Sequence, residues 1–185
     1  MDVAKGFTFV ELMIVLTIMT LLTIIAFPSV SDMLERQATT TAVNRLVVAV
    51  KIARHNAMQY RTTATLCALK ADGKCGASWA NELTVFLDKN QNARWEEPED
   101  KLRVVPALTS NASIKWRAFR NQQYLQMTTF GMTNYQNGNF VVCPSSGNVR
   151  WAKQLVLNVQ GRLRKNHRIN EAGYPVDRNG RLLRC

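Results

Sequence analysis

The first feature of the hydrophobic pattern is an uninterrupted apolar segment near the N-terminus. Residues 12–27 read LMIVLTIMTLLTIIAF, in which three threonines are the only polar side chains and no charge occurs. With the flanking GFTFVE the segment reaches about twenty residues, the length that spans a bilayer core as a helix. A buried core helix would show a polar stripe, and a secretory signal would show a small-residue cleavage site after the apolar run. Pro28 and a helix-compatible stretch follow instead, so we expect a retained membrane helix.

The pattern becomes amphipathic after Pro28. Apolar residues recur with helical spacing as far as Met58, and arginine and lysine residues lie between them. This spacing predicts an amphipathic helix that ends near Tyr60. Ser31 or Asp32 is expected to cap a renewed helix after the proline.

From Thr62 onward the pattern changes to short segments rich in β-branched and aromatic residues, separated by Gly, Asn, Asp and Ser. Such segments predict strands, and Asn137-Gly138 is a hairpin signal. One long helix followed by strands predicts an α+β fold, with the N-terminal helix packed on an antiparallel β-sheet. The predicted strands cover residues 62–69, 82–87, 101–105, 113–119, 123–130, 139–144 and 153–159.

The net charge is +11, and it is concentrated near the C-terminus, where the last 42 residues carry nine basic and two acidic side chains. Along LVLNVQGRLRK the apolar residues alternate, so Arg162 and Arg164 are expected on the exposed face of one strand, which Gly161 allows to bend. With Lys165 and Arg168 they would form a clamp for phosphate groups. Phosphate polymers and anionic lipid are therefore candidate partners.

The cysteines predict disulfide bonds rather than a metal site. Cys67, Cys75, Cys143 and Cys185 include no Cys-x-x-Cys pair, and neither histidine is near a cysteine in the sequence. If the domain lies outside the inner membrane, disulfides can form there. Three pairings are possible, and we favour Cys67 with Cys75 and Cys143 with Cys185.

One polar segment raises the question of calcium. Asp88, Asn90 and Asn92 alternate, and Glu99 follows, as in a calcium-binding loop. Ala93 occupies the place where such loops need glycine, so we favour a polar turn between two strands. No combination of Ser, His and Asp, no Cys–His pair and no glycine-rich phosphate loop predicts catalysis. We therefore expect no enzyme activity, no cofactor and no metal.

Glu11 is a charged residue near the start of the apolar run, where an unpaired carboxylate costs a few kcal/mol. The segment KGFTFVELMIVLTIMTLLTIIAFPS resembles the N-terminus of a type IV prepilin. The resemblance implies that a prepilin peptidase cuts after Gly6 and methylates Phe7. Glu11 would pair with the new amine of Phe7, one helical turn away, or with the same amine of a neighbouring subunit. Pro28 is the proline that kinks the helix in that family.

The segment SWANELTVFLDKNQNARWEEPEDKLRVV resembles the globular domain of the GspH/FimT group of minor pilins and pseudopilins. Asn81 and Glu82 stand where this group commonly has a glycine. GRLR is similar to the Gly-Arg-x-Arg motif of FimT-type minor pilins, which bind DNA during natural transformation. This resemblance implies that Gly161, Arg162 and Arg164 contact DNA without sequence preference and with strong salt dependence.

The resemblance implies a minor type IV pilin of the FimT/FimU type that helps to initiate or cap the filament and binds double-stranded DNA for uptake. Its other partners would be major and minor pilins, prepilin peptidase and inner-membrane lipid. The chain would cross the bacterial inner membrane once, hold its domain in the periplasm, and reach the pilus and the cell surface after assembly. The alternatives are a type II secretion pseudopilin and, less favoured, a membrane-anchored periplasmic enzyme or metal-binding protein. The expected segments are a leader (1–6), a transmembrane and assembly helix (7–28), its amphipathic continuation (29–61) and a β-rich domain with a basic C-terminal segment (62–185).

Overall fold

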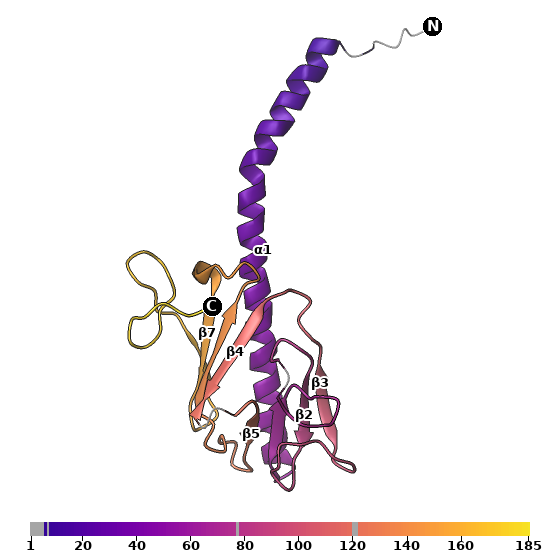
Figure 1. Cartoon of the computed structure of the whole chain (residues 1–185), viewed down its shortest axis with the longest axis vertical. Coiled ribbons are helices and arrows are strands. Elements are labelled where there is room, and N and C mark those ends of the chain that lie inside the picture. The colour runs from indigo at the N-terminus through magenta and orange to yellow at the C-terminus, as the bar shows by residue number, and fades with distance from the viewer. Residues whose placement is uncertain (1–5, 7, 77, 120–121) are drawn as a thin grey trace.

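The fold combines one long helix with two β-sheets (Figure 1). The computed structural model describes residues 6, 8–76, 78–119 and 122–185, except for the side chains of residues 25–29. The expected α+β architecture, a long N-terminal helix packed on antiparallel strands, is confirmed. The strands form two separate sheets rather than one.

The helix α1 is a single element of 51 residues, Phe9–Gln59, and is about 76 Å long at 1.5 Å per residue. Thr8 caps it, because the Thr8 hydroxyl accepts a hydrogen bond of 3.2 Å from the Glu11 backbone N–H. The prediction of a renewed helix capped by Ser31 or Asp32 was wrong, since both residues lie inside α1. A proline removes one backbone donor from a helix, and the turns on both sides continue the helix here. The ribbon curves along its N-terminal half (Figure 1).

Both sheets are antiparallel and four-stranded. The first has the order β3-β2-β1-β5 and contains Ala64–Cys67 (β1), Leu83–Leu87 (β2), Lys101–Val105 (β3) and Leu125–Met127 (β5). The second has the order β4-β6-β7-β8 and contains Ser113–Ala118 (β4), Gly138–Cys143 (β6), Lys153–Leu157 (β7) and Leu163–Asn166 (β8). A short 3-10 helix, η2 (Val149–Trp151), precedes β7.

The core lies between the C-terminal half of α1 and the two sheets. Small and aliphatic residues of α1, from Ala42 to Ala57, are fully buried at helical spacing. Three aromatic rings fill the space toward the second sheet, with centroid distances of 4.1 Å between Trp116 and Phe140 and 4.9 Å between Trp79 and Phe140. The alanines of the α1 stripe let both sheets approach the helix closely.

Two turn predictions were wrong. Asn137-Gly138 does not close a hairpin, because β5 and β6 belong to different sheets and Gly138 begins β6 opposite Ala118 of β4. A Cβ atom on Gly138 would overlap the Arg117 carbonyl, so this glycine allows two strands to approach each other. The segment after Leu157 does not continue as one bent strand, because the chain reverses there and returns as β8.

Candidate functional site

The N-terminal half of α1 extends beyond both sheets (Figure 1). Its large apolar side chains from Phe9 to Ile24 are exposed by between 46% for Val15 and 73% for Phe9. The hydroxyls of Thr17, Thr20 and Thr23 donate to backbone carbonyls of the preceding helical turn at 2.8–3.1 Å. Because these hydroxyls bond within the helix, Glu11 is the one strongly polar side chain that residues 9–24 present to their surroundings.

The processing and assembly residues lie at this end of the chain. Gly6 is exposed, whereas Phe7 lies outside the described residues. Among the described residues, none pairs with the Glu11 carboxylate, which remains available for an amine. The backbone of Pro28 lies inside α1. Within the described ranges, no helix is both long and apolar enough to cross a membrane. Membrane insertion of residues 7–28 therefore stays a prediction.

Three tight turns of one kind shape the C-terminal part of the chain, with the pattern Asn/Asp-x-x-Gly-x. They span residues 158–162, 170–174 and 177–181. In each, the backbone N–H groups of the first residue and the glycine bond within the turn, and the first side chain accepts from the N–H of the last residue. Gly161 has a φ of +71°, which favours glycine. This repeated signal was readable in the sequence and was missed there.

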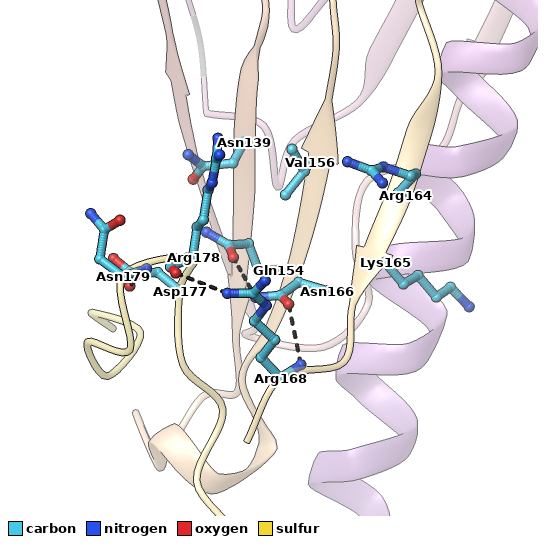
Figure 2. Close-up of a pocket in the computed structure, with 10 residues that line it drawn as sticks. All are labelled: Asn139, Gln154, Val156, Arg164, Lys165, Asn166, Arg168, Asp177, Arg178 and Asn179. Carbon is cyan, nitrogen blue, oxygen red and sulfur yellow. Dashed lines mark hydrogen bonds between the residues drawn. The ribbon is translucent and has the colours of Figure 1, made fainter. Parts of the chain in front are cut away.

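The four residues of the predicted phosphate clamp lie at the end of the turn at 158–162 and along the chain after it, but they do not all share one face of β8. Arg162 precedes β8, Arg164 and Lys165 lie within it, and Arg168 follows it. Adjacent residues of a strand point to opposite faces, and Figure 2 shows the Arg164 and Lys165 side chains pointing apart. The Lys165 ammonium reaches the side chain of Asn44 on α1 at 3.5 Å, whereas Arg164 faces outward.

Arg164 and Arg168 line a groove of about 760 Å³ on the outer face of the second sheet (Figure 2). Arg178 borders the groove from the C-terminal segment, and its carbonyl accepts from the Arg168 guanidinium at 2.9 Å. Asp177 is the one acidic side chain of this lining, and its carboxylate is held by the backbone N–H groups of Asn179 and Arg181. The groove is therefore strongly positive.

A second hollow of about 230 Å³ borders the same C-terminal segment. Lys115 and Arg117, which alternate with buried residues along β4, face it together with Arg181 and Arg184 of the C-terminal segment. The two hollows share Asn139, Gln154 and Asp177. We call the outward-facing basic residues of the two hollows the outer basic face: Lys115, Arg117, Arg164, Arg168, Arg178, Arg181 and Arg184.

A disulfide between Cys143 of β6 and Cys185 fixes the C-terminal segment to the sheet. Leu183, 5% exposed, packs beside it in a small apolar cluster. The other disulfide joins Cys67 to Cys75. These are the two pairings that the sequence analysis favoured. The Cys143–Cys185 disulfide holds one side of the groove in place.

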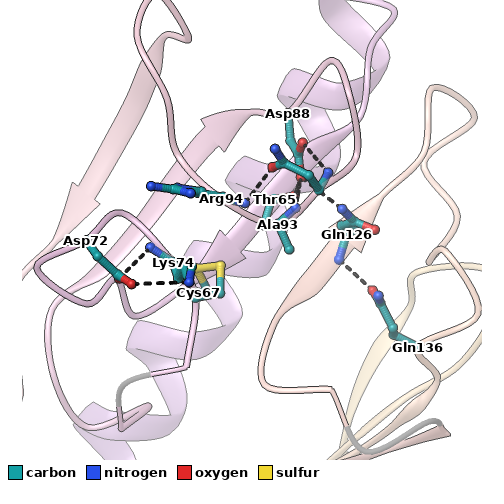
Figure 3. The surroundings of a disulfide bond; sticks show 11 residues. Thr65, Cys67, Asp72, Lys74, Asp88, Ala93, Arg94, Gln126 and Gln136 are labelled. Carbon is teal, nitrogen blue, oxygen red and sulfur yellow. Dashed lines mark hydrogen bonds and ion pairs between the residues drawn. A yellow bond between two sulfur atoms is a disulfide. The ribbon is translucent and has the colours of Figure 1, made fainter.

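The segment with the calcium-like pattern is organised by a buried carboxylate (Figure 3). Asp88 is fully buried and accepts hydrogen bonds from Thr65 Oγ1 at 2.6 Å, Gln126 Nε2 at 2.9 Å and the backbone N–H groups of Ala93 and Asn92 at 3.0 and 3.1 Å. In the described part of the chain, no three His, Cys, Asp or Glu side chains lie where they could hold a metal ion. Because its carboxylate accepts these four hydrogen bonds, Asp88 acts as a structural anchor of the turn.

Comparison with known proteins agrees with this architecture. The family described as type II transport protein GspH matches residues 42–161, and the prokaryotic N-terminal methylation motif matches residues 1–27. No protein with a curated description matches the chain.

Solved structures with a similar fold include the type IV minor pilin FimU of Pseudomonas aeruginosa in two crystal forms. One has a TM-score of 0.58 and 18% identity, and the alignment covers 76% of this chain and 95% of FimU. The other has a TM-score of 0.53 and 18% identity, with 74% and 96% covered. The minor pseudopilin EpsH from the Type 2 Secretion System of Vibrio cholerae gives a TM-score of 0.44 and 12% identity, with 70% and 92% covered.

The structural likeness to FimU shows the fold, and the two sequence matches show the family. The GspH match alone covers well over half of the residues. The chain belongs to the GspH family of minor pilins and pseudopilins, within the type IV pilin superfamily.

Proposed function

We propose that the chain is a minor pilin of a type IV pilus. The observation that carries this proposal is the N-terminal half of α1, which exposes its large apolar side chains from Phe9 to Ile24 and projects from a domain with its own core. An uncovered helix of this kind needs lipid before assembly and other helices afterwards. Residues 7–28 would span the inner membrane once, with the globular domain in the periplasm, until the chain enters the filament and helps to initiate or cap it.

Assembly would follow cleavage of residues 1–6 by prepilin peptidase and methylation of Phe7. Glu11 would then pair with an N-terminal amine of this chain or of a neighbouring pilin, because a carboxylate surrounded by apolar helices needs an opposite charge. A minor pseudopilin of a type II secretion system would share this architecture. The outer basic face favours the pilus, because a filament exposed at the cell surface can meet anionic polymers.

Mass spectrometry and a matched pair of variants test the assembly proposal. The purified protein should lack residues 1–6 and carry a methylated Phe7. Glu11→Gln should strongly reduce the amount of the chain in sheared pili. Glu35→Gln, which removes a carboxylate from the same helix within the globular domain, should leave it unchanged. An intact Met1 in cells with an active peptidase, or normal incorporation of Glu11→Gln, would refute the proposal.

A second proposed activity is binding of double-stranded DNA by the outer basic face. Eight basic side chains line the two hollows, namely Lys165 and the seven of the outer basic face, and the carboxylate of Asp177 is held by backbone N–H groups. Arg162 at the preceding turn extends the positive surface along β8. Gly161 is buried beside the Gly131 carbonyl, so its role is to shape this turn rather than to touch DNA. Lys165 faces α1 and is left out of the proposed contact.

Fluorescence anisotropy of the full chain in detergent with labelled duplex DNA tests this activity. If about four phosphates are neutralised, the affinity should fall roughly a hundred-fold between about 50 and 200 mM salt. Arg162→Gln with Arg164→Gln, and separately Arg164→Gln with Arg178→Gln, should weaken binding. Lys51→Gln with Lys89→Gln removes two exposed charges elsewhere and should have little effect. Equal losses in all three double variants would show that only the net charge matters.

A further inference from the structure

Three segments meet at the end of the globular domain opposite the projecting half of α1. They are the last turns of α1 (52–60), the turn at 128–132 with the residues that follow it to 135, and the turn at 158–162. The backbone N–H and hydroxyl of Thr133 both donate to the Val159 carbonyl, at 2.9 and 3.3 Å. We name these three segments together the distal tip.

Two glycines set this packing. A Cβ atom on Gly131 would lie 2.7 Å from the sulfur of Met58 and 3.0 Å from Arg54 Nε. A Cβ atom on Gly161 would overlap the Gly131 carbonyl. The two turns therefore touch each other through their backbones and rest on the end of α1. Their neighbouring side chains, Phe130 and Arg162, flank the same contact and are both exposed.

The distal tip exposes large apolar side chains. Phe130 is 82% exposed, more than any of the apolar side chains described between Phe9 and Ile24 of α1, and Tyr135 is 66% exposed. Phe130 is the third residue of a turn closed by the Thr128 N–H donating to the Met132 carbonyl at 2.7 Å, so the backbone holds it at the apex. The tip also exposes Met58, Tyr60, Met132 and Val159, each by 40–52%.

The charge of the distal tip has one sign. Its three segments contain no acidic residue, whereas Arg54 and Arg162 lie among the exposed aromatic residues. The Arg54 Nε atom is buried without a hydrogen-bond partner among the described residues. From Arg162 the positive surface continues along β8 to Arg164 and the outer basic face. A ligand that matches both the exposed aromatic side chains and the positive charge has flat rings and a negative backbone. Unpaired nucleotides have this chemistry.

We propose that the distal tip binds single-stranded DNA, with an unpaired base stacked on Phe130 and the adjacent phosphate held by Arg162. This inference rests on the proposed DNA binding and adds to it a preference for single-stranded ends. The outer basic face contacts the phosphates of a duplex, and the distal tip takes the strand where the bases become accessible. The tip lies at the end of the domain away from the projecting half of α1, so an assembled chain can present it outward.

The test compares three labelled DNA molecules with the full chain in detergent: a blunt duplex, the same duplex with an overhang of about ten nucleotides, and the single strand alone. The overhang and the single strand should bind more tightly than the blunt duplex. Phe130→Ala should remove this difference with a loss of roughly 5- to 150-fold, because stacking of one base contributes about 1–3 kcal/mol. Phe130→Trp should keep the preference. Ile169→Ala removes another exposed apolar side chain, 66% exposed, and should change nothing.

The results separate this inference from the proposed function. If the wild-type chain binds no DNA, both fail. If it binds duplex DNA, loses affinity in Arg164→Gln with Arg178→Gln, and is indifferent to overhangs and to Phe130→Ala, only the stacking inference is overturned. If Phe130→Ala blocks entry into pili and leaves DNA binding intact, the tip is a subunit contact and the inference is also overturned. An unchanged circular dichroism spectrum of each variant confirms that it is folded.

Discussion

The buried carboxylate of Asp88 gives the sharpest stability prediction. Thr65 Oγ1, Ala93 N–H and Gln126 Nε2 donate to one carboxylate oxygen, and Asn92 N–H donates to the other. An asparagine offers one oxygen, so its NH₂ group must face either the three donors on one side or the Asn92 N–H, which also donates to Asn90 Oδ1 at 3.2 Å. An unsatisfied donor costs about 1–3 kcal/mol, and each remaining bond loses about 1 kcal/mol of charge assistance. Because the neutral side chain is easier to bury, we expect Asp88→Asn to lower the free energy of unfolding by about 3 kcal/mol.

The assay is urea unfolding of the globular domain within the full chain in detergent, followed by tryptophan emission. Trp79 and Trp116 are 2% and 5% exposed, so unfolding moves them into water and shifts their emission to the red. With a slope of about 2 kcal/mol per molar urea, the midpoint of Asp88→Asn should fall by about 1.5 M. Asp100→Asn makes the same chemical change at an exposed position and should leave the midpoint unchanged. Equal midpoints for wild type and Asp88→Asn would refute the assignment of Asp88 as a structural anchor.

Three further predictions concern the second sheet and its connections. Gly138→Ala places a Cβ atom against the Arg117 carbonyl, so the β4–β6 pair must separate. The same urea assay should show that the free energy of unfolding falls by about 3 kcal/mol or more. A wild-type midpoint would contradict the close approach of the two strands. Cys143→Ser with Cys185→Ser opens a loop closed across 42 positions and should lower the free energy of unfolding by about 4 kcal/mol. A wild-type midpoint for this double variant in the urea assay would contradict the prediction. Burial, more than neighbouring positive charge, lowers the pKa of Lys153, so the folded chain holds this proton less tightly than the unfolded chain. Thermal stability should therefore gain a contribution as the pH rises toward the ordinary value of 10.5, and Lys153→Met should lack that gain in a series of melting curves.

Much of the fold could be predicted from the sequence because its signals are local. Apolar periodicity located the buried stripe of α1, and β-branched segments located β1 to β7. The hairpin between β7 and β8 was missed because alternation continues from Leu155 and Leu157 to Leu163, with the same parity on both sides of the turn. Asn158 and Gly161 marked the reversal, since an Asn-x-x-Gly segment closes its own hydrogen bonds. An alternating pattern shows which side chains share a face of a sheet, but it does not show whether the chain continues or reverses its direction.

The candidate site was predicted only in part. The concentration of positive charge near the C-terminus located Arg164, Lys165 and Arg168, which all line the groove, but it could not show that the Lys165 ammonium turns toward Asn44 on α1. The contribution of Lys115 and Arg117 depends on the pairing of β4 with β6, which brings them to the C-terminal segment from more than 60 positions away. Long-range pairing of this kind has no signal within either segment.

The unbroken course of α1 has a mechanical consequence. One continuous helix of 51 residues extends from the projecting end to the far end of the domain, and its buried stripe from Ala42 to Ala57 packs on both sheets. Tension applied at the projecting end acts along the helix axis, so it loads the whole stripe in shear at the same time. Strands pulled from an edge would instead separate one hydrogen bond after another. In the proposed filament, a force along α1 would therefore reach both sheets through this buried stripe.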